Sequence, residues 1–126
     1  MPWAFRIDTD RGLAEIRFSG DLSPDEVYAA FQELAERPDF RPEMSVLSDH
    51  TAAVGTTDWS AEAVRFLARR LPLFEGRARR AFVMETKVGF GLARMFELVR
   101  ERHRSAAIRV FRDAAEARGW LLGRDE

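Results

Sequence analysis

Apolar and polar side chains alternate in two short runs near the start of the chain, at residues 3–7 and 13–18. Such alternation is typical of a β-strand with one buried face. Asp10, Arg11 and Gly12 lie between the two runs and are residue types that favour a tight turn. The pattern therefore predicts an N-terminal β-hairpin.

A helical repeat of apolar residues follows the hairpin. Ser23 and Glu26 have the spacing of a capping box, and Pro24 occupies the first helical position. We therefore expect a first helix over residues 24–36. Its predicted core-facing residues are Val27, Ala30, Phe31 and Leu34.

Three more helices are expected from the same spacing of apolar residues. The second begins near Trp59 and ends near Leu71, the third follows a turn at residues 89–91, and the fourth is capped by Asp113. Their predicted inward-facing residues are Ala63, Phe66, Leu67, Leu71 and Phe74, then Leu92, Met95, Phe96 and Val99, and finally Ala114, Ala117 and Leu121. Trp59, Phe66 and Phe74 are expected in the core, with the lining of an apolar ligand groove as their alternative role.

Short apolar runs at residues 44–48, 81–84 and 107–111 read as buried strands. The element order is then ββαβαβαβα, and right-handed crossovers through the helices make the later strands parallel. The sequence predicts an α/β fold with a mainly parallel five-stranded sheet, an N-terminal β-hairpin and four helices. No linker or repeat interrupts the pattern, so we expect one domain over residues 1–126.

Ligands and partners of parallel sheets meet the loops that follow the carboxyl ends of the strands. In this chain those loops are expected at residues 49–59 and 85–91. A functional site is therefore expected at these two segments.

Composition narrows the chemistry. Hydrophobic residues make up 46% of the chain, which is enough for a core, and there is no cysteine for a disulfide, a thiolate nucleophile or a thiolate metal ligand. No apolar run approaches the roughly 20 residues of a membrane-spanning helix. We therefore expect a cytoplasmic protein with no integral membrane segment.

Charge is unevenly distributed along the chain. Residues 1–62 carry a net charge of −8 and residues 63–126 carry +7, which leaves a total of −1. Either the two halves intertwine and the asymmetry is lost, or a basic face meets an acidic partner. The arginines near the second helix are not interleaved with aromatic residues that could stack on bases, so nucleic acid is not an expected partner.

The ordered set of motifs resembles the SpoIIAA-like branch of the STAS domains (sulfate transporter and anti-sigma-factor antagonist). The matching segments are the hairpin leading into residues 20–26, the strand ending at Asp49, the helix start at residues 91–95 and the C-terminal residues 110–121. The resemblance implies a non-enzymatic module that binds another protein or a small ligand. It also implies regulation by phosphorylation of a serine or threonine at the start of the second helix.

The sequence departs from that regulatory pattern, because the Asp-Ser-x-Gly-like phosphorylation motif is absent. Hydroxyl groups in about the corresponding place belong to Thr56, Thr57 and Ser60. We expect these residues, with Asp49, His50 and Asp58, to form a partner-binding or switch loop. The alternative is that Thr57 or Ser60 merely caps the second helix.

Enzymatic sites fit the sequence poorly. Ser48, Asp49 and His50 are adjacent, and successive strand residues point to opposite faces of a sheet. With two histidines and no cysteine, no metal or cofactor is expected. Gly89 and Gly91 offer an anion site at a helix start, although Arg94 breaks the dinucleotide-binding fingerprint.

The leading hypothesis is a non-catalytic module that engages a protein partner through the loop at residues 49–60 and the second helix. The alternative is a carrier of a small apolar or anionic ligand, held in a groove between the second and third helices near Arg65, Arg69 and Arg94. A homodimer is compatible with either hypothesis.

Overall fold

A computed structural model describes residues 2–54, 59–74, 78–101 and 107–123 of the chain. The strands are β1 (Trp3–Asp8), β2 (Leu13–Asp21), β3 (Ser45–Val54), β4 (Arg79–Val83) and β5 (Ala107–Phe111). The helices are α1 (Pro24–Ala35), α2 (Ala61–Arg70), α3 (Lys87–Glu101) and α4 (Ala114–Leu121). The predicted order ββαβαβαβα is confirmed.

All five strands form one sheet in the order β1-β2-β3-β4-β5. The β1–β2 hairpin is antiparallel, in a register that pairs Trp3 with Phe18 and Asp8 with Leu13. The other neighbouring strands are parallel. The predicted α/β fold with a mainly parallel sheet and an N-terminal hairpin is therefore confirmed.

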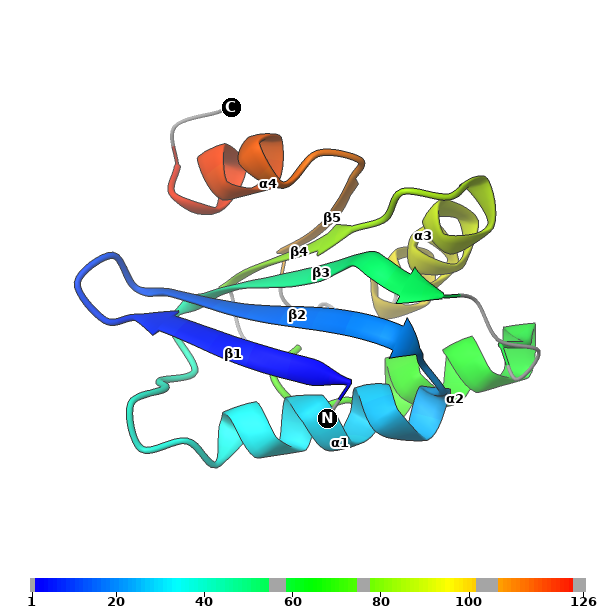
Figure 1. Ribbon diagram of the computed structural model, residues 1–126, viewed down its shortest axis with the longest axis horizontal. Helices are drawn as coiled ribbons and strands as arrows, with labels where there is room; N and C mark the ends of the chain where they lie inside the picture. The colour runs from blue at the N-terminus through cyan, green and yellow to red at the C-terminus, as the bar shows by residue number, and fades with distance from the viewer. Residues whose placement is uncertain (1, 55–58, 75–77, 102–106, 124–126) are drawn as a thin grey trace.

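The helices lie on both faces of the sheet, but unequally. Because each parallel strand is added on the same side of the previous one, right-handed crossovers bring α1, α2 and α3 to one face. Figure 1 shows α1 and α2 on one side of the sheet and α4 on the other. Helix α4 has no following strand, so it can fold back over the second face, where it packs on β3, β4 and β5.

Each face has its own apolar cluster. The larger cluster joins one face of the sheet to α1, α2 and α3, and Phe18, Phe31 and Phe74 are almost completely buried in it. The smaller cluster joins the other face to α4, where the indole of Trp120 lies 5.8 Å from the ring of Phe111. Successive side chains of a strand point to opposite faces of the sheet, so the same strands contribute to both clusters.

Two predicted boundaries were wrong. Strand β3 continues beyond residue 48 to Val54, because β2 supplies backbone partners for it up to Asp21. Helix α3 begins at Lys87, so the predicted turn at residues 89–91 lies inside the helix. The side chain of Thr86 makes this start favourable, because its hydroxyl accepts a hydrogen bond from the Gly89 N–H at 2.9 Å.

One predicted core residue was also wrong. Phe66 is 44% exposed, and the buried residues of α2 are Val64, Leu67 and Ala68. The turn of the helix places Phe66 beside the arginines of the outer surface, with the Arg70 guanidinium 5.4 Å from the centre of its ring. Phe74, in contrast, is 1% exposed, as expected for a core residue.

No helix within the described ranges combines the length and the apolar character needed to span a bilayer.

Candidate functional site

A cavity of about 420 Å³ opens where β3 and β4 end and α3 begins. Its volume lies within the range of about 300–1,000 Å³ that is usual for small-molecule sites. The described residues that line it are Leu22, His50, Thr51, Ala53, Val54, Trp59, Met84, Glu85, Thr86, Val88, Gly89 and Leu92. We call it the His50 cavity.

The position of the cavity follows from the parallel sheet. The carboxyl ends of β2, β3 and β4 meet at one edge, and residues beyond those ends supply most of the lining. The lining therefore draws on both segments expected from the sequence, residues 49–59 and 85–91. Trp59 closes one side, and its indole N–H donates a hydrogen bond to the carbonyl oxygen of Leu22 at 2.8 Å.

A break in the pairing of β2 with β3 occurs beside His50. Arg17 pairs with Asp49 and Ser19 pairs with Ala52, so two residues of β3 lie opposite Phe18 alone. Such a bulge locally bends a strand and re-aims its side chains. Here it sets the imidazole of His50 against the ring of Phe18, with centroids 4.6 Å apart in a stacked arrangement.

The environment of His50 keeps its imidazole uncharged. Phe82 packs on the ring as well, at 5.9 Å between centroids. Burial lowers the pKa of His50 to about 4, because an imidazolium would lose its hydration, and this outweighs the opposing effect of the negative charge of Asp49. The Nε2 atom is buried and finds no hydrogen-bond partner among the described residues.

Three other polar side chains of the lining already have partners. The Thr51 hydroxyl donates to Asp49 Oδ1 at 2.7 Å, and the Thr86 hydroxyl accepts from Gly89. The indole N–H of Trp59 is bonded to Leu22. Nε2 of His50 is a buried polar atom of a lining residue that has no such partner among the described residues.

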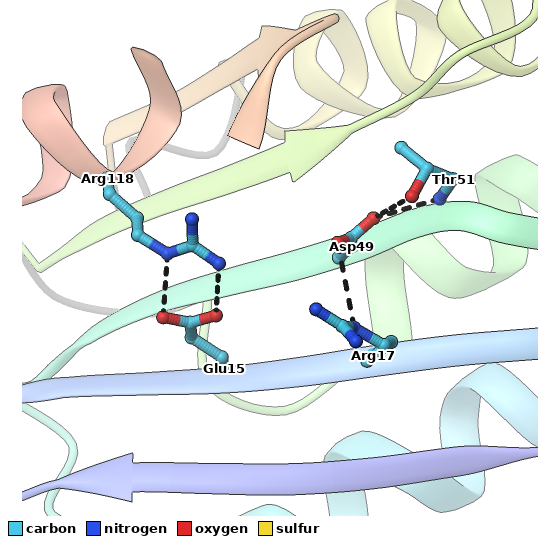
Figure 2. A network of polar contacts seen from close by, with 5 residues as sticks. All are labelled: Glu15, Arg17, Asp49, Thr51 and Arg118. Atoms are coloured by element: carbon cyan, nitrogen blue, oxygen red, sulfur yellow. Dashed lines mark hydrogen bonds and ion pairs between the residues drawn. The ribbon is translucent and has the colours of Figure 1, made fainter. Parts of the chain in front are cut away.

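Asp49 belongs to a polar network on the opposite face of the sheet (Figure 2). One of its carboxylate oxygens accepts from the backbone and side chain of Thr51, and the other lies 4.0 Å from Arg17 Nε. Nearby, Arg118 of α4 forms two hydrogen bonds of 2.9 Å with Glu15 of β2. Asp49 and His50, adjacent in sequence, thus belong to different faces.

The expected switch hydroxyls are only partly covered by the structure. Thr56, Thr57 and Asp58 lie outside the described residues. Ser60 is the N-cap of α2, and its hydroxyl accepts from the backbone N–H of Ala63 at 3.1 Å. This contact is the one that the capping interpretation requires.

The arginines expected beside a ligand do not line the cavity. Arg65 and Arg69 are exposed on α2, and Arg94 of α3 is paired with Glu97 at 2.7 Å. A smaller apolar void of about 40 Å³ is lined by residues of α1, α2, α3 and β4. The larger His50 cavity lies at the edge of the sheet, beside the start of α3.

The two glycines expected to hold an anion differ in position. Gly89 lines the His50 cavity, and its backbone N–H is already donated to Thr86. A Cβ at this position would approach the Thr86 hydroxyl to 3.0 Å, so glycine permits the close turn. Gly91 is exposed within α3.

The sequence predicts His50 in a partner-binding or switch loop, whereas in the structure it lies within β3 and its ring packs against Phe18. The sequence does carry a signal for this position, because His50 continues the two-residue alternation of Val46 and Ser48, whose side chains are buried.

No group of three potential metal ligands occurs in the part of the chain that the structure describes.

The chain has an α/β fold with a mainly parallel sheet and an apolar pocket at the carboxyl edge of that sheet. Its architecture is similar to the crystal structure of an uncharacterized protein of the DUF3478 family, with a SpoIIAA-like fold, from Shewanella loihica. The two chains are 19% identical, with a TM-score of 0.56 over 94% of this chain and 91% of the other. The chain thus has a SpoIIAA-like fold, whereas no protein-family model and no curated protein matches it.

Proposed function

We propose that this protein is a non-catalytic binding module that takes up a small, mainly apolar ligand in the His50 cavity. The observation that carries the proposal is the cavity itself, with a volume of about 420 Å³ and a mainly apolar lining at the carboxyl edge of a parallel sheet. The SpoIIAA-like fold is compatible with a binding module.

The mouth of the cavity supports an apolar ligand. Val54 and Val88 both line it and are 57% and 73% exposed. The binding free energy becomes more favourable by about 25 cal/mol for each Å² of this exposed apolar surface that a ligand covers. A ligand that enters between them therefore removes exposed apolar surface from the protein as well as its own.

Binding of an uncharged fluorescent dye, N-phenyl-1-naphthylamine, tests the proposal. We expect the dye to brighten with the wild-type protein and to lose this response in Ala53→Trp, whose larger side chain fills the cavity. Ala115 is exposed on α4, across the sheet, so Ala115→Trp is the matched control and should bind the dye normally. Equal dye binding by all three proteins would refute the cavity as the binding site.

A protein partner is the second candidate function, through residues 49–60 and α2. The observation that favours it is the exposed ring of Phe66 on α2, with Arg70 stacked over it. Aromatic and arginine side chains together are typical of binding hot spots. A partner isolated from the host should be lost with Phe66→Asp and kept with Leu98→Asp, which changes a similarly exposed residue of α3.

A further inference from the structure

The polar chemistry of the His50 cavity restricts the ligands it can take. Most of the lining is aliphatic or aromatic, so a ligand gains most of its affinity from apolar contact. Orientation must come from the few polar groups that lack a partner. Nε2 of His50 is such a group, buried and without a partner in the described ranges.

A charged head group fits this environment poorly. Apart from His50, Glu85 is the ionisable side chain among the described lining residues, and it is exposed at the mouth. Lys87, close to it in sequence, is exposed and is not part of the lining. A carboxylate or phosphate inside would have no described cation to pair with and would face the charge of Glu85.

The imidazole of His50 can complement an uncharged polar group. It is held between Phe18 and Phe82, so its ring plane is fixed by packing. A neutral imidazole carries one proton, and Nε2 is an acceptor or a donor depending on which nitrogen holds it. A hydroxyl group both donates and accepts, and it therefore satisfies Nε2 in either tautomer.

We infer that the ligand of the His50 cavity is an uncharged molecule with an apolar body and a hydroxyl group that hydrogen-bonds to Nε2 of His50. This inference rests on the proposed function and adds the chemical class of the ligand. Of the apolar and anionic ligands expected from the sequence it excludes the anionic one, because Arg65, Arg69 and Arg94 do not line this cavity.

Calorimetric titration with three eight-carbon probes tests the inference: octan-1-ol, octanoate and octylammonium. We expect the wild-type protein to bind octanol at least tenfold more tightly than either charged probe. In His50→Phe the aromatic stack is kept and the nitrogen is removed, so octanol binding should weaken about three- to tenfold.

Leu92→Ala is the matched control, because Leu92 lines the same cavity without a polar atom. It should weaken octanol binding through lost apolar contact and should keep the ¹⁵N shift change of His50 that octanol causes in the wild type. Octanol binding with no change in the His50 ¹⁵N shift, or octanoate binding as tightly as octanol, would overturn the inference.

The dye experiment separates the two proposals. Dye binding that is blocked by Ala53→Trp, combined with no preference among the three head groups, leaves the cavity as a binding site and removes the hydroxyl-bearing ligand. Failure of dye and all probes to bind overturns both.

Discussion

Buried cations are the most unusual residues of this fold. Arg80 of β4 is 1% exposed, and its guanidinium donates to the backbone carbonyls of Pro42, Met44 and Leu73. Arg100 of α3 donates in the same way to the carbonyls of Ala68 and Phe74, near the end of α2. The fixed fork of an arginine can satisfy several carbonyls at once, so each side chain ties irregular backbone to a regular element.

Replacement of Arg80 by methionine should destabilise the protein by about 3 kcal/mol or more. The backbone carbonyls that accept from its guanidinium would remain buried without a hydrogen-bond donor. Burial lowers the pKa of Arg80 to about 10, so the cation itself is present at neutral pH. Urea unfolding measures the change. Arg65→Met alters an exposed arginine of α2 and should stay within about 0.5 kcal/mol of the wild type. A similarly small effect at both positions would show that the Arg80 hydrogen bonds contribute little to the free energy of unfolding.

His50 should make stability depend on pH. Its pKa is about 4 in the folded chain against 6.5 in the unfolded chain, so below pH 6.5 the unfolded state binds a proton that the folded state does not. Stability from neutral His50 is complete above pH 6.5 and falls as the pH drops toward 4. The loss amounts to about 3 kcal/mol over this window.

The measurement compares urea unfolding of the wild type and His50→Phe between pH 7.5 and pH 4. The variant keeps the carboxylates and His103, so their titration cancels in the difference. We expect the wild type to lose about 3 kcal/mol relative to the variant over this range. Two parallel stability curves would contradict a depressed His50 pKa.

At the scale of elements, capping residues mark where helices begin. Ser23 and Glu26 form a complete capping box at α1, and Asp113 accepts from the Glu116 N–H at the start of α4. Ser60 does the same for α2. All three caps belong to elements whose order was predicted from the sequence.

Substitution of the α2 cap distinguishes a structural serine from a regulatory one. Ser60→Ala should lower stability by about 1 kcal/mol, and Ser60→Asp should restore it, because aspartate also accepts from the first-turn N–H groups. Thermal melting measures both. If Ser60, Thr56 or Thr57 is a phosphorylation switch, aspartate at that position should release a bound partner and alanine should retain it. Retention with every aspartate variant would end the switch hypothesis.

Helix α4 is expected to be integral to the core of the second face. Trp120 and Leu121 are 7% and 5% exposed in the cluster that also contains Phe111. Truncation after Ala117 removes both side chains and should cost at least the 3–5 kcal/mol of one buried aromatic residue. Truncation after Gly123 keeps the whole helix and should melt like the full chain. If the protein truncated after Ala117 melted within a degree or two of the full chain, this role of α4 would be contradicted.

At the scale of the whole molecule, the acidic and basic halves of the sequence share one sheet. β3 from the first half pairs with β4 from the second, and α4 packs against both strands. Several basic residues of the second half are also used internally, because Arg80 and Arg100 are buried and Arg79 donates to the carbonyl of Trp120. The charge asymmetry along the sequence therefore does not translate fully into a charge asymmetry of the molecular surface.

We predict a single cooperative unfolding transition for residues 1–126. Both apolar clusters are built on the same strands, so neither can persist after the sheet is lost. Differential scanning calorimetry should give equal calorimetric and van't Hoff enthalpies. Two separable transitions would contradict one domain.

The sequence alone determined the type and order of the elements. Alternation in the hairpin, the capping box at Ser23 and the helical repeat of α4 are local signals, and each depends on residues only a few positions apart. The resemblance to the SpoIIAA-like fold followed from their order. The same element order predicted a functional site at residues 49–59 and 85–91, and both segments line the His50 cavity.

Only the tertiary structure decided which side chains share a site. The extension of β3 to Val54 depends on backbone partners in β2, and the exposure of Phe66 depends on the side of α2 that meets the sheet. The environment of His50 depends on Phe18 and Phe82 from two other strands. Burial and hydrogen bonding are set by residues distant in sequence, so no local pattern could show that Arg80 is a core residue or that His50 is uncharged.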